Sequence, residues 1–196
     1  MAVAMRFIRS DLGIEVSNTQ LSPVNTFSID VSGYYQSEEE NYGKFNGKWR
    51  GGFNLSNIGP KISYTDSEDN ENFIPTNLKL GGGFDFILDD VNTIGATLEF
   101  TKLLVPTPPL RNADNEITKG KDDNVGFFKG MFQSLGDAPG GFSEEINEIT
   151  WALGVEYLYD NAFALRAGYF NQDNLKGARK YYTLGTGFKF QNSTID

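Results

Sequence analysis

Apolar and polar residues alternate along most of this chain, and that alternation limits the possible folds more than any other feature of the sequence. Phe27, Ile29 and Val31, for example, alternate with Ser28 and Asp30. Successive side chains of a β-strand point to opposite faces, so a period of two indicates strands with one apolar and one polar face. No run of residues approaches the ~18 consecutive apolar residues of a membrane-spanning helix. The pattern therefore predicts an all-β chain, and any membrane span in it would have to be a strand.

The alternation predicts eight strands, near residues 1–9, 25–36, 48–64, 75–88, 92–104, 145–159, 162–171 and 179–191. In the third, Asn57-Ile-Gly-Pro60 is either a turn that splits the strand or an interruption within it. The connection lengths favour one whole strand, so we interpret Pro60 as a bulge or an edge kink, where a missing N–H is tolerated. With that strand kept whole, the tight links at 89–90 and 160–161 fall on one side of an antiparallel sheet. The long links 65–74, 105–144 and 172–178 fall on the other side. Short turns at one end and long loops at the other are typical of transmembrane β-barrels.

A soluble β-sandwich or barrel is the alternative, because it also has one apolar face. Three details favour the membrane. The predicted polar faces combine charged residues with many of the chain's 22 glycines. Aromatic residues such as Tyr35, Tyr157 and Tyr169 gather near predicted strand ends, which suits an interfacial girdle. Strands of about 9–14 residues also suit a tilted crossing of a ~25–30 Å apolar layer. We therefore predict an antiparallel transmembrane β-barrel.

The segment 105–144 is far longer than an ordinary hairpin link, and loops of that length are usually functional or disordered. It opens rigidly with Val105-Pro-Thr-Pro-Pro109. An apolar stripe then follows at helical spacing, formed by Val125, Phe128, Phe132 and Leu135. We predict a short helix with Asn124 or Asp123 as the N-cap and Gly136 as the stop.

Two roles are open for this helix. It docks into the mouth of the barrel as a plug, or it presents Phe127, Phe128, Met131 and Phe132 to a protein partner. Protein interfaces are enriched in aromatic and Met side chains, and a rigid proline entry limits the entropy lost on binding. The two roles are compatible with each other.

Four charged residues on the predicted polar faces form a second candidate site: Asp85, Glu99, Glu156 and Arg166. They form either a charge network that fills the lumen or a selective constriction. We favour the network, because the interior of a membrane barrel is polar by default.

Composition excludes several classes of function. The chain has no His and no Cys, which removes disulfides, His or Cys metal ligands and Ser-His or Cys-His nucleophile pairs. Its formal net charge is −9, with no basic tract to neutralise phosphates, so nucleic-acid binding is a poor hypothesis. We predict no catalytic residues, no cofactor and no metal. The acidic stretch 66–72 lacks the glycine and glutamate positions of an EF-hand loop, so we interpret it as a solvated hairpin loop.

The two ends of the chain suggest a longer protein. The opening segment 1–9 is too short for the apolar region of a signal peptide and contains Arg6 and Arg9. We expect residues 1–196 to form one partial barrel domain that lacks the signal peptide, the N-terminal strands and the closing strands. The strands near 1–9 and 179–191 would then not pair with each other.

Four separated blocks of sequence carry a resemblance to a known family. They are residues 1–12, Trp49-Arg-Gly-Gly-Phe-Asn-Leu-Ser-Asn-Ile-Gly-Pro-Lys-Ile-Ser-Tyr64, Phe73-Ile-Pro-Thr-Asn-Leu-Lys-Leu-Gly-Gly-Gly83 and Tyr182-Thr-Leu-Gly-Thr-Gly-Phe-Lys-Phe190. They resemble the C-terminal half of the outer-membrane shuttle proteins of the type IX secretion system. The resemblance implies a FadL-like barrel of about fourteen strands, of which eight lie here.

The resemblance also implies a function. Such a protein is an integral outer-membrane protein with its long loops facing the cell exterior, and it is not an enzyme. It collects cargo that carries a C-terminal signal domain from the large translocon barrel and passes it to the attachment complex, which contains a sortase. The alternative function is a FadL-like transporter of hydrophobic small molecules. An esterase or deacylase is the remaining class, and the absence of His excludes a Ser-His pair within these residues.

Overall fold

The computed structural model describes residues 1–11, 15–16, 19–20, 23–64, 71–190 and 193–195, which form two compact units. Unit 1 comprises Met1–Ser32, Asn54–Leu78 and Leu103–Ile146. Unit 2 comprises Gly33–Phe53, Lys79–Lys102 and Asn147–Asp196.

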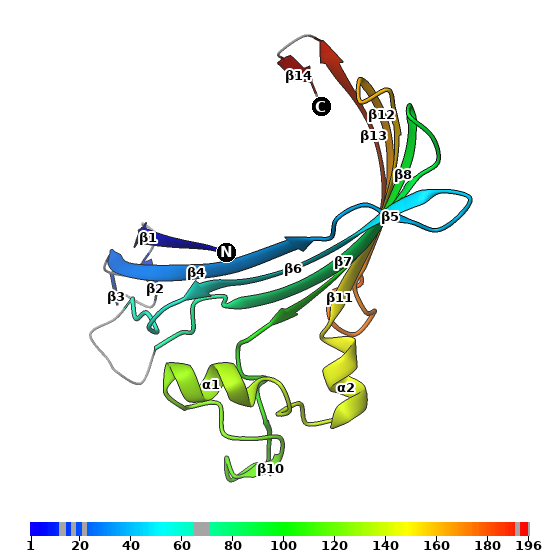
Figure 1. Ribbon diagram of the computed structural model, residues 1–196. Coiled ribbons are helices and arrows are strands. Elements are labelled where there is room, and N and C mark those ends of the chain that lie inside the picture. Colours follow the sequence, from blue (N-terminus) through cyan, green and yellow to red (C-terminus); the bar gives the residue numbers. More distant parts are fainter. Residues whose placement is uncertain (12–14, 17–18, 21–22, 65–70, 191–192, 196) are drawn as a thin grey trace. The chain divides into compact units, whose positions relative to one another are not determined.

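Ten strands of the described residues form one sheet, in the order β1-β4-β6-β7-β8-β11-β12-β13-β14, with β5 paired to β6 off this path. The eight long strands are β1 (Ala2–Ser10), β4 (Val24–Gln36), β6 (Asn46–Ile58), β7 (Asn77–Ile87), β8 (Asn92–Leu103), β11 (Thr150–Tyr159), β12 (Phe163–Asn171) and β13 (Lys180–Phe190). Each of them coincides with one of the eight predicted strands, so the all-β prediction is confirmed (Figure 1). The strand order ends at β1 and at β14 (Ser193–Ile195), so the described strands do not close into a ring.

The register within unit 2 places residues of one kind on one face. Val155 of β11 lies opposite Ala96 of β8 and Ala167 of β12, and Ala167 lies opposite Leu184 of β13. The next position along, Glu156, lies opposite Arg166. All of these pairings are antiparallel, as the tight links predict. The sheet of unit 2 therefore has an apolar face and a polar face.

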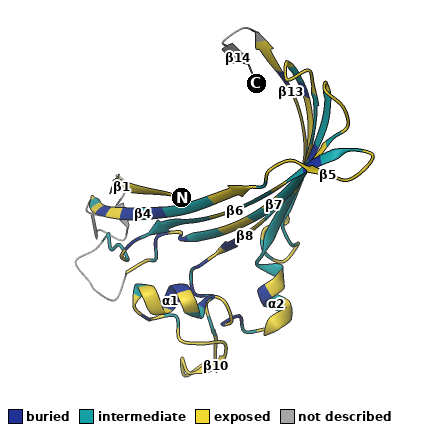
Figure 2. Ribbon diagram, viewed as in Figure 1, coloured by how far each residue is buried: buried dark blue, intermediate teal, exposed yellow. Residues whose placement is uncertain are grey.

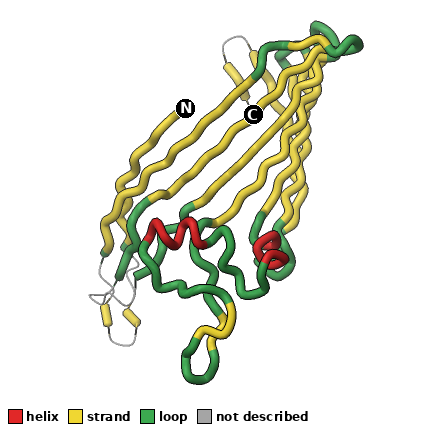
Figure 3. Tube along the Cα trace, turned by 60° about the horizontal axis from the view of Figure 1, so that its bottom comes forward, coloured by secondary structure: helices red, strands yellow, loops and turns green. Residues whose placement is uncertain are grey.

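Several short elements were not predicted from the sequence. They are the strands β2 (Glu15–Val16), β3 (Thr19–Gln20), β5 (Glu40–Asn41), β9 (Leu110–Arg111), β10 (Ile117–Lys119) and β14, and the helix α2 (Phe142–Asn147). Figure 3 shows both helices, α1 (Phe127–Gln133) and α2, in the long connection between β8 and β11. Runs of two or three residues are too short to produce a period that sequence analysis detects.

Two predicted boundaries were wrong. The predicted strand 48–64 ends at Ile58, because Asn57 has a positive φ of 59° and the dipeptide Gly59–Pro60 follows. The predicted strand 145–159 begins only at Thr150, because the residues before it form α2.

Unit 1 contains the described core beneath α1. Ile74, Leu104, Val125, Met131 and Ala138 are its buried hydrophobic residues. The backbone N–H of Leu104 donates to the carbonyl of Thr76 at 2.7 Å, which ties the start of the long connection to the segment before β7. Figure 2 shows that α1 and α2 each combine buried and exposed positions. A small hydrophobic core therefore holds the long connection against the segment before β7.

Among the described residues, no helix has both the length and the apolar character that crossing a membrane would require.

Candidate partner-binding surface

Helix α1 is anchored in unit 1 by its small residues. A Cβ atom added at Gly130 would lie 2.6 Å from the ring of Phe73 and 3.0 Å from Pro106, so only glycine allows this close approach. Met131, one residue further on, is only 7% exposed, and Ser134 at the C-cap is fully buried. One side of α1 is therefore fixed against the segment before β7 and the proline-rich entry of the loop.

The opposite side of α1 carries large apolar side chains without cover from the described residues. Phe128 and Phe132 are each 67% exposed, and Leu135 just beyond the helix is also exposed. Phe127 is half-buried, and its ring stacks at a tilt on Phe128 with 4.9 Å between centroids. Positions i, i+4 and i+7 lie on one side of a helix, so Phe128, Phe132 and Leu135 form a continuous stripe, here called the α1 stripe.

The structure divides the four predicted contact residues. It places Phe128 and Phe132 on the surface and Phe127 at its edge, whereas Met131 belongs to the core. The predicted helix exists, but its start was wrong: the N-cap is Gly126, with no side-chain cap, and neither Asn124 nor Asp123 serves. The C-cap is Ser134, so the helix ends before the predicted stop at Gly136.

The rest of the long connection is held by carboxylates that accept backbone hydrogen bonds. Oε1 of the buried Glu145 in α2 accepts from the N–H groups of Asp137 and Ala138, at 2.6 and 2.7 Å. The N–H of Thr107 in turn donates to Oδ2 of Asp137 at 3.2 Å. Charge-assisted bonds of this kind are stronger than neutral ones. The loop that carries the α1 stripe is thus an ordered scaffold.

The four predicted lumen charges lie on the polar face of unit 2, in separate ion pairs. Arg166 Nε donates to Oε2 of Glu156 at 2.5 Å, so these two predicted residues do pair. Asp85 instead pairs with Arg50 at 2.8 Å, and Glu99 pairs with Lys79 at 3.2 Å. Arg50 and Lys79 were missed as partners, because the alternation places residues on a face but gives no register between strands.

A second cluster of charged residues lies in unit 1. Arg6 of β1 pairs with Asp30 of β4, and the N–H of Asn57 donates to Oδ1 of Asp30 at 2.9 Å. Asn57 also accepts from Arg6 at 3.2 Å and donates to the carbonyl of Pro75 at 3.0 Å. Each charged or polar group in this cluster has a partner, so the arrangement serves structure and offers no reactive group.

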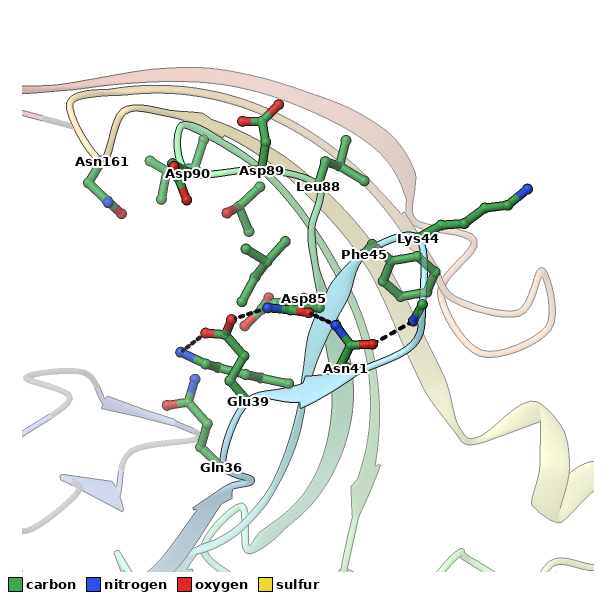
Figure 4. Close-up of a pocket in the computed structure, with 16 residues that line it drawn as sticks. Gln36, Glu39, Asn41, Lys44, Phe45, Asp85, Leu88, Asp89, Asp90 and Asn161 are labelled. Atoms are coloured by element: carbon green, nitrogen blue, oxygen red, sulfur yellow. Dashed lines mark hydrogen bonds and ion pairs between the residues drawn. The ribbon is translucent and has the colours of Figure 1, made fainter.

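A polar pocket of about 540 Å³ lies in unit 2 among the connections before β5, after β7 and after β11. Figure 4 shows Glu39, Asn41 and Asp85 around it, with Lys44 pointing away. A hydrogen bond from Asn46 lowers the pKa of Glu39, and Lys48 acts in the same direction. The backbone N–H of Val91 lowers the pKa of Asp89, helped by the side chain of Asn92.

Both pKa values are lowered, whereas a carboxyl group that acts as a general acid near neutral pH needs a raised pKa. In the described part of the chain, no three side chains of His, Cys, Asp or Glu come together as metal ligands. Most of the acidic stretch 66–72 lies outside the described residues. Among the described residues, the candidate functional feature is therefore the exposed α1 stripe, and the ion pairs have a structural role.

Taken together, the fold defines an antiparallel β-sheet protein with one apolar face, one ion-paired polar face and an ordered loop that exposes an apolar helix. Residues 1–110, more than half of the chain, match the family model described as Type IX secretion system protein PorV. The chain belongs to this family and is a type IX secretion system protein. A comparison with curated proteins gave no match. Helix α1 and strands β11 to β13 lie beyond the matched residues, so the roles inferred for them rest on their own structure.

Proposed function

We propose that this protein is a non-enzymatic carrier in the outer membrane, a FadL-like barrel protein that binds the C-terminal signal domains of type IX cargo. It receives cargo from the large translocon barrel and passes it to the sortase-containing attachment complex. Membership of the family supports the secretion role. The α1 stripe, anchored on one side and open on the other, is the observation that carries the binding role.

Membrane insertion is supported by two aromatic rows on the apolar face of unit 2. One row joins Trp151, Tyr169 and Tyr182, with centroid distances of 5.5 and 4.8 Å. The other joins Phe163 and Phe188 at 5.0 Å. The two rows are separated along β12 by about 20 Å of strand.

The surface between the rows is aliphatic and exposed. Its exposed aliphatic residues are Leu153, Val155, Leu165, Ala167 and Leu184, with Tyr157 and Thr186 beside Leu165 on the same face. An aliphatic band bounded by aromatic residues on both sides is the arrangement that transmembrane barrels present to lipid. The outer membrane is the proposed location for this reason, with the long loops on the outside.

Protein binding by the α1 stripe is supported by its rigidity. Interface hot spots are large side chains that enter desolvated pockets of a partner. Phe128 and Phe132 are large and exposed, and the helix that carries them is already ordered, which lowers the entropy lost on binding. A non-enzymatic role is supported by the lack of His and Cys and by the lowered pKa values of Glu39 and Asp89, which do not suit a general acid.

The test replaces both Phe128 and Phe132 by Ala in the protein with its native partners. Cargo capture should weaken by about 2 kcal/mol or more, roughly thirtyfold in affinity, while assembly of the sheet is unchanged. Leu175→Ala, at another highly exposed apolar residue, is the matched control and should leave capture unaltered. If the double substitution lowers the heat resistance of the folded protein on a gel but leaves capture intact, the helix is a plug.

One observation favours the second candidate, transport of hydrophobic small molecules. Unit 1 contains a cavity of about 260 Å³ whose lining includes Ile8, Val24, Ile62, Ile74 and Pro75. Filling it with Ile74→Phe should block uptake of a fatty acid if the protein is a transporter, and should leave cargo capture unchanged if it is a carrier.

A further inference from the structure

The apolar face of unit 2 carries a groove between β6 and β11. The groove, of about 270 Å³, has walls formed by Trp49, Phe84, Leu98 and Leu153, and its lining also includes Gly82 and Ala96. These residues come from β6, β7, β8 and β11, so the groove crosses four neighbouring strands.

The groove exists because two positions on this face, Gly82 and Ala96, carry almost no side chain. Around Gly82, the neighbours of the same face on β7 are Leu80 and Phe84, both large. A Cβ atom at Gly82 would meet nothing nearer than the carbonyl oxygen of Arg50, at 3.9 Å. At Gly47, by contrast, the ring of Phe84 already lies 2.2 Å from such an atom.

Glycine in a strand usually marks a close approach of other atoms or an unusual backbone angle. Gly82 has neither, since its φ is not positive and the space above it is open. Glycine also weakens a strand relative to alanine. The space above Gly82 is therefore available to a molecule other than the protein.

The lining of the groove determines the chemistry of that molecule. Its wall side chains are all apolar, and the one charged residue, Arg50, directs its guanidinium to Asp85 and to Thr97 at 2.8 and 3.1 Å. A polar ligand would lose its hydrogen bonds to water in this groove and would find no ion pair or hydrogen bond to replace them. The lining therefore favours a hydrocarbon.

The position of the groove indicates how the hydrocarbon is attached. At one end Trp49 packs edge-on against Phe84 at 4.7 Å, and Trp49 Nε1 donates to the hydroxyl of Tyr42 at 3.2 Å. Indole and phenol groups favour the level of lipid headgroups, with an apolar body and a polar tip. Leu153 belongs to the aliphatic surface between the aromatic rows, and Leu98 lies opposite Leu153 on the neighbouring strand β8.

We propose that this groove binds one acyl chain of a membrane phospholipid, with the polar end of the lipid beside Tyr42 and Trp49. The inference rests on the membrane insertion in the proposed function. The groove selects a flexible chain, because it is open along one side and has no polar group to orient a rigid ligand.

Quenching of Trp49 fluorescence tests the proposal, since Trp49 is a wall of the groove. Trp151→Phe leaves Trp49 as the single tryptophan of the chain. This protein is placed in phosphatidylcholine vesicles with a rising mole fraction of lipid brominated along its acyl chains. Quenching should rise steeply at low mole fractions, because a bound chain is retained beside Trp49.

Gly82→Leu fills the groove and should remove the steep part of the curve, leaving only quenching by surrounding lipid. Ala96→Leu fills it from the neighbouring strand and should act in the same way. The matched control is Gly51→Leu, because Gly51 lies on the same face with nothing within 4 Å but does not line the groove. The control should keep the steep part.

Two outcomes overturn the proposal: identical curves for the filled and open grooves, or an equal loss with Gly51→Leu. A protein that carries both tryptophans and shows quenching of neither in vesicles would instead contradict the membrane insertion itself. The two failures are therefore distinguishable.

Discussion

The ammonium group of Lys102 donates to Oε2 of Glu148 at 2.8 Å, at the point where β8 runs into the long connection. Lys176, from the link between β12 and β13, donates to the other carboxylate oxygen at 3.0 Å. The side chains of Lys102 and Glu148 are only 10% and 15% exposed. Within unit 2, one carboxylate thus ties the end of β8 to the link between β12 and β13.

Replacing Glu148 by Gln should therefore lower the free energy of unfolding by about 3 kcal/mol, because two cations each lose an ion pair with a largely buried carboxylate. Urea unfolding in detergent, followed by tryptophan fluorescence, measures this. Glu156→Gln is the control, since the pair of Glu156 with Arg166 is 40% and 41% exposed and such pairs contribute about 0–1 kcal/mol. Equal losses at the two sites would contradict the role assigned to Glu148.

Gly47 and Gly51 lie on the same face of β6 and should respond in opposite ways to alanine. The Cβ atom of Gly47→Ala would lie 2.2 Å from the ring of Phe84, and overpacking of this kind costs about 1–3 kcal/mol. Gly51→Ala meets nothing within 4 Å and should be neutral or slightly stabilising. Thermal unfolding of the two variants gives the comparison. Phe84→Leu should partly rescue Gly47→Ala.

Alternation predicted the eight long strands because a period of two is a property of each segment alone. Leu165 and Arg166 fall on opposite faces whatever strand lies next to them. The partners of Asp85 and Glu99 could not be obtained in this way. They depend on the register between strands, which involves residues far apart in the sequence.

Helix α1 shows a similar limit. The apolar spacing of Phe128 and Phe132 located the helix, but an apolar stripe is normally the buried side. Here the side with Gly130 and Met131 is buried instead. The ring of Phe73 packs directly against Gly130, and a side chain at that position would prevent this contact. A lone glycine in a helical segment was the available signal. It could not indicate which distant residue would fill the space.

Asn57 adopts a left-handed φ of 59° at the end of β6, and four hydrogen bonds hold it there. Asn57→Ala should destabilise the protein by about 2 kcal/mol, because alanine is strained at this angle and loses the side-chain bonds to Arg6 and Pro75. Asn57→Gly also loses these side-chain bonds, but glycine is not strained at this angle, so the loss of stability should be smaller. Denaturant unfolding of both variants measures the difference. A glycine variant as unstable as the alanine variant would show that backbone strain plays no part.

Glu39 should make stability depend on pH. Its pKa is lowered mainly by the hydrogen bond from Asn46, with Lys48 as a further cause. A carboxyl group whose pKa is lower in the folded state stabilises the fold fully above its unfolded pKa, and this contribution is lost as the pH falls through the folded pKa. Titration by NMR should place the pKa of Glu39 below that of an ordinary glutamate. In Asn46→Ala it should move upward, toward the ordinary value. Lys44→Ala is the control, because Lys44 points away from the pocket and is not among the causes of the shift (Figure 4). An unchanged pKa in Asn46→Ala would show that this hydrogen bond does not hold Glu39 in its ionised form.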